Sequence, residues 1–401
     1  MLCPFKSSFL HQFSFRPFTF LAALLGLLAC FGASPAVALY DVNPSEIPGK
    51  PGTVIRVWPL QGGGPGGGEA FRILYRSTGL RGEPIAVSGA VFLPGGPAPA
   101  GGREIIAYAH PTSGVMPACA PSLRPDTAGM IWGLRQMLQA GYVVAATDYP
   151  GLGTNTMHPY LYGVSEARSV LDSVRAARAL EHTQASERFV VWGHSQGGQA
   201  ALFTGQIAGS YAPELKLMGV AAAAPATYLL ELFEDDYHDE GGKILTAMAL
   251  LSWSRIKGVP LKNVVEPQAM DAFMRTAEQC LESPGDALTL QKDAKPLQAG
   301  GFLKIDPVKT EPWRSIMQEN STGRQRIPVP VFLAQGTADT TVNPAVTKQY
   351  GGALCKQGTR VHFVEMPGTT HTFAARDSVS AALQWMEGRF RGAPAPSSCG
   401  G

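Results

Sequence analysis

Apolar residues along the chain gather in short runs that are separated by loops rich in glycine and proline. The runs 53–60, 71–78 and 85–93 have the length and composition of strands. The last two are joined through Gly82 and Pro84, which predicts an antiparallel pair. The glycine-rich stretch 61–69 lacks the strand-to-helix context of a phosphate loop, so we interpret it as a flexible turn.

From residue 104 onward, the pattern changes to strands that alternate with helices. Strands are predicted at 104–109, 143–147, 188–192 and 218–224, and helices at 129–140, 165–180 and 198–209. Such alternation is typical of βαβ units, so we expect a mostly parallel sheet flanked by helices. Two strands at 329–335 and 360–366 and a helix at 378–390 extend the same α/β pattern.

The segment 165–180 has the period of an amphipathic helix. Its apolar residues recur at three- and four-residue spacing and form one stripe, made of Ala167, Val170, Leu171, Val174 and Ala177. The charged residues outside the stripe are Arg168, Asp172, Arg175 and Arg178. We interpret the arginines as a solvated face of the helix and not as an anion site.

The strand alternation stops between residues 226 and 326, where the chain becomes helical. This segment contains an acidic stretch at 231–240 and an almost continuous apolar run at 244–253. We interpret it as a helical cap inserted into the sheet. The predicted organisation is therefore a first part of the core at 39–225, the cap at 226–326, and a second part of the core at 327–401.

The N-terminal residues have the pattern of an export signal. Lys6 and Arg16 precede an apolar run at 18–28, and Ala36-Val37-Ala38 fits a cleavage site of small residues, so 1–38 is predicted to be a signal peptide. The protein is then expected to be secreted, periplasmic or extracellular. An alternative is a lipid anchor on Cys30, because 27–30 weakly resembles a bacterial lipoprotein box.

Cysteine usage agrees with an oxidising compartment. Beyond the predicted signal the chain has an even number of cysteines, namely Cys119, Cys280, Cys355 and Cys399. Two disulfides are plausible, and the sequence alone allows three pairings.

Composition and charge exclude several classes of protein. The 33 Lys and Arg residues nearly balance the 31 Asp and Glu residues, and the net charge of +2 gives no electrostatic footprint for nucleic acid. Apolar residues make up 45% of the chain, so a large folded core is expected instead of disorder. No protein partner is evident.

The sequence Gly193-His194-Ser195-Gln196-Gly197 matches the G-x-S-x-G pattern of a nucleophile elbow. The predicted strand 188–192 precedes it and a helix start follows, which is the context that the elbow requires. Gly193 and Gly197 flank Ser195 because side chains there would collide with the adjacent strand and helix. We therefore predict Ser195 to be a nucleophile.

A serine nucleophile needs a base and an acid that orients the base. Asp339 lies in a loop after the strand 329–335, and His371 lies in the loop after the strand 360–366. The order Ser195, Asp339, His371 is that of the α/β-hydrolases. The other histidines considered do not fit the base position: His110, His158, His194 and His362.

Two other acids are alternatives to Asp339. Asp377 follows His371 and is expected to cap the helix that begins at Ser378. Asp148 ends a predicted strand and is expected to have a structural role in its loop.

An oxyanion formed on the substrate needs two hydrogen-bond donors. The Gln196 backbone N–H is one candidate, because it lies at the helix start next to the nucleophile. The second should come from the loop after the first parallel strand. There Pro111 follows His110 and has no N–H, so the Thr112 backbone N–H is predicted to be the donor.

These features resemble the cap-bearing secretory lipases of the yeast lipase A type and their bacterial relatives. The resemblance rests on Asp148-Tyr149-Pro150-Gly151-Leu152-Gly153, His158-Pro159-Tyr160, Ser165-Glu166-Ala167-Arg168, the elbow followed by Gly198, and Gln335-Gly336-Thr337-Ala338-Asp339.

The resemblance implies an α/β-hydrolase fold with an inserted cap and hydrolysis of triacylglycerols or shorter esters. Residue by residue, it implies Ser195, Asp339 and His371 as catalytic residues and Thr112 with Gln196 as the oxyanion pair. It also implies pairing of Cys119 with Cys280, which leaves Cys355 with Cys399. No metal or organic cofactor is expected. A short-chain esterase and an acyltransferase on the same fold remain alternatives.

Overall fold

The computed structural model describes residues 40–236, 240–298 and 301–400. The predicted signal peptide and Cys30 lie outside the described residues. In the described part of the chain, nine strands form one sheet in the order β1-β2-β3-β5-β4-β6-β7-β8-β9. The strands are β1 (Val54–Pro59), β2 (Glu69–Thr78), β3 (Pro84–Leu93), β4 (Arg103–Ala109), β5 (Val143–Thr147), β6 (Ala185–His194), β7 (Lys216–Ala223), β8 (Val331–Gly336) and β9 (Val361–Met366).

Two kinds of strand pairing divide the sheet. Strands β1, β2, β3 and β5 pair antiparallel with their neighbours, whereas β5, β4, β6, β7, β8 and β9 run parallel. The predicted mostly parallel α/β sheet is confirmed. Because parallel strands end at the same edge, the loops after β4, β6, β8 and β9 come together there.

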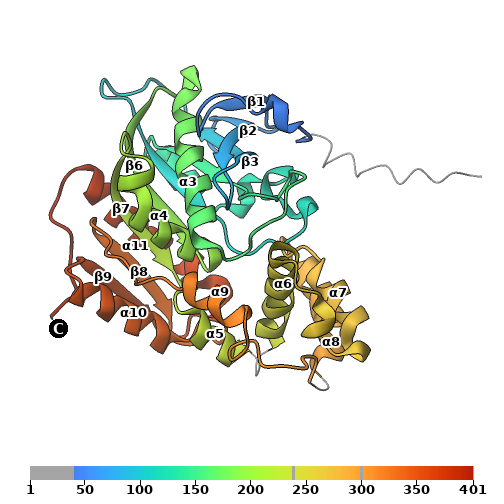
Figure 1. Cartoon of the computed structure of the whole chain (residues 1–401). Helices are drawn as coiled ribbons and strands as arrows, with labels where there is room; N and C mark the ends of the chain where they lie inside the picture. Colours follow the sequence, from blue (N-terminus) through green and yellow to red (C-terminus); the bar gives the residue numbers. More distant parts are fainter. Residues whose placement is uncertain (1–39, 237–239, 299–300, 401) are drawn as a thin grey trace, which may run out of the picture. The chain divides into compact units, whose positions relative to one another are not determined.

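Helices cover both faces of the sheet (Figure 1). One face carries α3 (Gly163–Ala179), α4 (Gln196–Tyr211) and α10 (Pro344–Lys356), and the other carries α2 (Leu134–Gln139) and α11 (Ala374–Phe390). Side chains of β4 alternate between the two resulting cores. Ile105 and Ala107 pack with α3 and α4, whereas Ile106 and Tyr108 pack with α2 and α11.

Two expectations about helices need correction. The region 129–140 is not one helix, because a 3₁₀ turn at Ala128–Met130 precedes α2 and Gly133 adopts a φ of 86° between them. The charged side of α3 is also only partly solvated. Asp172 is fully buried and accepts hydrogen bonds from Ser77, Arg175 and Tyr211, which come from β2, α3 and α4.

Helices also occupy the segment between β7 and β8. They are α5 (Leu229–Asp236), α6 (Glu240–Lys257), α7 (Met270–Ala277), α8 (Pro284–Gln298) and α9 (Trp313–Glu319). Helices α6, α7 and α8 lie together (Figure 1). The apolar run predicted at 244–253 lies within α6 and is almost completely buried. We refer to this segment as the insertion, because its role as a cap remains a prediction.

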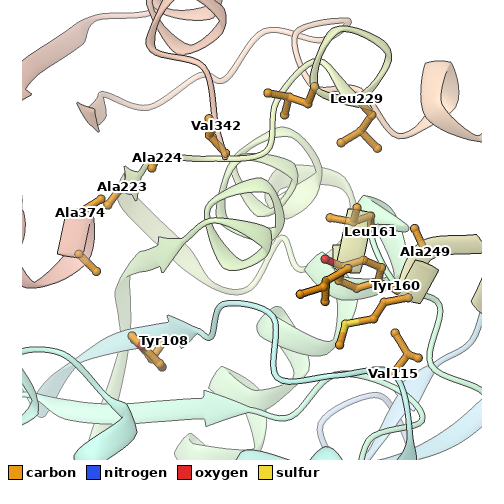
Figure 2. Packing of buried hydrophobic residues seen from close by; sticks show 14 of the residues in the cluster. Tyr108, Val115, Tyr160, Leu161, Ala223, Ala224, Leu229, Ala249, Val342 and Ala374 are labelled. Atoms are coloured by element: carbon orange, nitrogen blue, oxygen red, sulfur yellow. The ribbon is translucent and has the colours of Figure 1, made fainter. Parts of the chain in front are cut away.

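The insertion shares its hydrophobic core with one face of the sheet. Figure 2 shows Tyr160 and Leu161, from the loop before α3, beside Ala249 of α6. Leu229 of α5 and Val342 of the loop after β8 belong to the same buried cluster. The insertion therefore packs on the core through continuous apolar contact.

Two disulfides connect distant parts of the chain. Cys119 pairs with Cys280, and Cys355 pairs with Cys399. These are the pairs that the family resemblance implies. The first joins the loop after β4 to the segment between α7 and α8, and the second joins α10 to the C-terminal segment. In the described part of the chain, every helix is too short or too polar to span a membrane.

The two disulfides predict different contributions to stability. The first closes a loop between residues 161 positions apart and the second a loop between residues 44 positions apart. Loop-closure entropy then makes the loss from Cys119→Ala/Cys280→Ala about 1 kcal/mol larger than the loss from Cys355→Ala/Cys399→Ala. Guanidinium unfolding of both variants measures this difference. Equal losses would show that chain entropy does not set their ranking.

Candidate active site

Ser195 lies in the sharp turn between β6 and α4. Its φ of 57° and ψ of −119° belong to a backbone region that residues other than glycine rarely adopt. The turn is held by backbone hydrogen bonds, because the Ser195 N–H donates to the Ala223 carbonyl at 3.0 Å and the Ser195 carbonyl accepts from Gln199 at 3.1 Å. The side chain is thereby lifted above the end of the sheet.

The flanking glycines are required by close backbone approach. A Cβ atom on Gly197 would collide with the carbonyl of Ala109 in β4, and one on Gly193 would collide with the carbonyl of Gly197. Helix α4 can therefore begin directly against the strands. This close packing fixes the position of Ser195 relative to the neighbouring loops.

Ser195, His371 and Asp339 form a continuous hydrogen-bonded series. The His371 Nε2 atom lies 2.9 Å from Ser195 Oγ, and its Nδ1 atom lies 2.9 Å from Asp339 Oδ2. His371 begins a 3₁₀ turn after β9, and Asp339 lies in the loop after β8. The structure thus brings together the three residues predicted from separate segments of the sequence.

Asp339 is held as a carboxylate. Burial alone would raise its pKa, but hydrogen bonds from His371, the Val342 N–H and Gln335, together with the His371 charge, lower the pKa below its usual value. A fixed negative charge at this position holds the Nδ1–H tautomer of His371, which leaves Nε2 as the proton acceptor for Ser195.

The two predicted oxyanion donors come from segments that meet at the elbow, because Gln196 follows Ser195 and the Ala109 and His110 carbonyls that precede Thr112 closely approach Gly197. Gln196 is the first residue of α4, so its N–H has no acceptor within the helix. Thr112 lies in the loop after β4, and among the described residues no hydrogen-bond acceptor is found for its N–H. The Thr112 side chain is buried, with Oγ1 2.8 Å from the Tyr160 hydroxyl.

A small apolar cavity adjoins Ser195. It has a volume of about 30 Å³, enough for very few water molecules. Its wall includes Leu229, Leu232 and Phe233 of α5 and Val342 of the loop after β8, with the Asp236 side chain as a polar member. Helices of the insertion therefore form much of the boundary of the site.

A buried polar network beneath Ser195 was not predicted from the sequence. The Gln196 side-chain amide donates to Glu166 Oε1 at 2.8 Å and lies 3.3 Å from His158 Nε2. The Leu161 N–H donates to the same Glu166 oxygen. The motifs that contain Glu166 and His158 carry part of the family resemblance, but the roles of these two residues depend on contacts with the elbow that sequence spacing does not reveal.

The other residues weighed as candidates lie outside the hydrogen-bonded series. Asp148 is buried and accepts hydrogen bonds from Ser88 and Ser122, in agreement with a structural role. Asp377 does not cap a helix at Ser378, because α11 already begins at Ala374 and Asp377 lies in its first turn. No cluster of three or more potential metal ligands occurs among the described residues.

The fold and the site define an α/β-hydrolase with a serine, a histidine and an aspartate in hydrogen-bond contact. A family model described as "Secretory lipase" matches residues 129–398. The chain belongs to the secretory lipase family. It is accordingly an ester hydrolase, as the sequence predicted.

Individual relatives have low sequence identity to this chain, but the matches cover most of its length. The chain is 25% identical over 365 residues to a Mycobacterium tuberculosis protein named "Probable inactive lipase", covering 86% of this chain and 79% of that protein. It is 25% identical to a secreted triacylglycerol lipase of Malassezia globosa, covering 82% and 75%. The closed-state structure of Candida antarctica lipase A superposes with a TM-score of 0.73 at 18% identity, covering 87% and 84%. This structural likeness supports the fold.

The crowding at the elbow predicts that Gly197→Ala is destabilising. The added methyl group must displace the β4 backbone, and overpacking of this kind costs roughly 1–3 kcal/mol. The matched control is Gly209→Ala near the end of the same helix, where an added Cβ atom meets open space. This variant should stabilise the protein by up to about 1 kcal/mol, because alanine favours a helix over glycine. Thermal unfolding of both variants distinguishes the two positions, and equal melting temperatures would contradict the proposed crowding.

Burial of Glu166 predicts a pH-dependent contribution to stability. Burial raises its pKa from 4.5 to about 8, although hydrogen bonds from Gln196 and Leu161 act in the opposite direction. The folded protein then binds this proton more tightly than the unfolded chain, so stability is lost as the pH rises from 4.5 to 8.

The variant Glu166→Gln should lack this loss. Its free energy of unfolding relative to the natural protein should increase with pH through that window, by at most about 1.4 kcal/mol per pH unit, and level off above it. Urea unfolding across the pH range measures the difference. If the free energies of unfolding of the two proteins changed in parallel with pH, the Glu166 carboxyl would have the same pKa in the folded and unfolded states.

Proposed function

We propose that this protein hydrolyses carboxylic esters, with triacylglycerols as the substrate class, through a covalent acyl intermediate on Ser195. The observation that carries the proposal is the pair of 2.9 Å contacts that links Ser195 Oγ to His371 and His371 to Asp339. This arrangement provides a nucleophile, a base and an orienting acid in hydrogen-bond contact.

The first half of the reaction transfers the acyl group to the protein. His371 Nε2 takes the Ser195 proton while Oγ attacks the ester carbonyl. The Thr112 and Gln196 N–H groups donate to the resulting oxyanion, and the Asp339 carboxylate stabilises the imidazolium. The tetrahedral intermediate then expels the alcohol, which receives the proton from His371.

The second half releases the acid. His371 takes a proton from a water molecule, and the hydroxide attacks the acyl carbonyl. The same two N–H groups hold the second oxyanion. Collapse of this intermediate breaks the bond to Ser195 Oγ, which regains its proton from His371, and the carboxylic acid departs.

The apolar lining of the site supports a lipid substrate. Leu229, Leu232 and Phe233 offer a hydrophobic wall suited to an acyl chain. The name of the Malassezia globosa relative, a secreted triacylglycerol lipase, supports the same class. A fatty acyl chain needs far more room than about 30 Å³, so we expect the wall formed by α5 to move when such a substrate binds.

The small cavity also favours a second candidate, an esterase for short acyl chains. An acyltransferase would use the same residues but pass the acyl group to an alcohol. The relative named as inactive does not argue against activity here, because this chain carries the complete set of Ser195, Asp339 and His371.

We also propose that the protein acts outside the cytoplasm. Two disulfides suit an oxidising compartment, and the matched family is described as secretory. The predicted signal peptide at 1–38 supports the same location, with the lipid anchor on Cys30 as the alternative.

The experiment is hydrolysis of p-nitrophenyl esters of increasing chain length and of a triacylglycerol emulsion. Ser195→Ala should lower turnover by about 10⁴-fold or more, because it removes the nucleophile. The control Ser210→Ala changes an exposed serine at the far end of α4 and should have no effect. Activity on long chains and emulsion supports a lipase, whereas activity only on short soluble esters supports an esterase.

Product analysis with added alcohol tests the transferase alternative. Predominant formation of a new ester would favour acyl transfer over hydrolysis. Full activity of Ser195→Ala would contradict the proposed mechanism altogether.

A further inference from the structure

We propose that Tyr160 positions the oxyanion loop through its hydroxyl group and that helix α6 of the insertion holds Tyr160 in place. The oxyanion loop is defined here as residues 111–114. This inference deepens the proposed function and rests on the assignment of Thr112 as an oxyanion donor. Tyr160 is a positioning residue in this proposal, because it acts through Thr112.

The Tyr160 side chain connects the oxyanion loop to the substrate cavity. Its hydroxyl oxygen lies 2.8 Å from Thr112 Oγ1, and its side chain lines the cavity together with Ser195 and Gln196. Tyr160 is only 2% exposed and Thr112 only 8%. Since water has little access to replace this hydrogen bond, its loss would leave Thr112 free to change its orientation.

Helix α6 fixes the Tyr160 backbone at both of its polar atoms. The Tyr160 N–H donates to Ser252 Oγ at 3.1 Å, and Trp253 Nε1 donates to the Tyr160 carbonyl at 2.8 Å. The Ser252 hydroxyl also donates to the His158 carbonyl at 2.6 Å. Figure 2 shows Tyr160 next to Ala249 of the same helix.

The oxyanion loop has a second attachment to the insertion. The Leu281 N–H donates to the Ser113 carbonyl at 2.8 Å, directly after Cys280, which is bonded to Cys119. Thr112 and Ser113 are therefore both bonded to groups that the insertion holds. The insertion therefore supports the loop and also contributes residues that line the cavity beside Ser195.

The Tyr160 hydroxyl keeps its proton. Burial raises its pKa above the usual value, the hydrogen bond with Thr112 acts in the opposite direction, and the nearby Glu166 and Asp236 carboxyls raise it further. The contribution of Tyr160 to catalysis should then be the same across the working pH range. A loss of activity that varied strongly with pH would indicate a different role.

The test compares Tyr160→Phe with Tyr162→Phe. The first removes the hydroxyl that contacts Thr112. The second removes a buried hydroxyl for which the described residues offer no hydrogen-bond partner. We expect Tyr160→Phe to lower kcat by about 10- to 100-fold with KM changed by at most about twofold, and Tyr162→Phe to leave both unchanged.

Binding of a phenylboronic acid provides a readout of the oxyanion site itself. Its adduct with Ser195 mimics the tetrahedral intermediate, so Tyr160→Phe should weaken inhibition by a factor similar to the loss in kcat. Ser252→Ala loosens the attachment to α6 without altering Tyr160 and should show the same pattern with a smaller effect. If Tyr160→Phe and Ser252→Ala both kept the kcat and the boronic acid inhibition of the natural protein, the proposal would be overturned.

A double-mutant comparison identifies the route of action. If Tyr160 acts through the Thr112 hydroxyl, Thr112→Val should lower kcat similarly, and Tyr160→Phe/Thr112→Val should be no worse than either single variant. Multiplicative losses would show that Tyr160 acts elsewhere. These variants test the role of Tyr160 alone. The proposed function is tested separately, by the loss of ester hydrolysis in Ser195→Ala with no other residue changed.

Discussion

The strained turn at Ser195 is the constraint on which the site depends. A φ of 57° costs of order 1–3 kcal/mol for a residue with a side chain. The strain is offset by backbone hydrogen bonds to Ala223 and Gln199 and by close packing that Gly193 and Gly197 permit. Strands β4 and β7 flank β6 in the sheet and supply the Ala109 and Ala223 carbonyls that lie against this turn.

Charge around this turn is concentrated on one group. Burial and, to a lesser extent, the charge of His371 lower the pKa of His194 to about 3, so His194 is neutral and its Nε2–H can donate to the His371 carbonyl at 3.0 Å. Burial of Glu166 keeps that carboxyl protonated near neutral pH. Asp339, by contrast, remains ionised. A positive charge that develops on His371 therefore faces one carboxylate in a poorly solvated site, where the attraction is strong.

The sequence could predict the sheet and the three residues of the hydrogen-bonded series because their signals are local. Buried strands have continuous apolar runs, and Ser195, Asp339 and His371 each follow such a strand. Contacts between distant segments could not be predicted in the same way. Asp172 appeared to lie outside the apolar stripe of its helix, but groups from other elements bury and satisfy it. The contact of Tyr160 with Thr112 likewise joins two segments that are 48 residues apart in the sequence.

The attachments of the insertion restrict how the site can open. Helix α6 is hydrogen-bonded to the segment that carries Tyr160. The residues after α7 are joined to Cys119 by a disulfide and to Ser113 of the oxyanion loop by the Leu281 N–H. Moving the whole insertion would disturb the groups that hold Thr112. Helix α5 contributes the apolar wall through Leu229, Leu232 and Phe233. Widening of the cavity by displacement of α5 alone would admit an acyl chain while leaving the oxyanion donors in place.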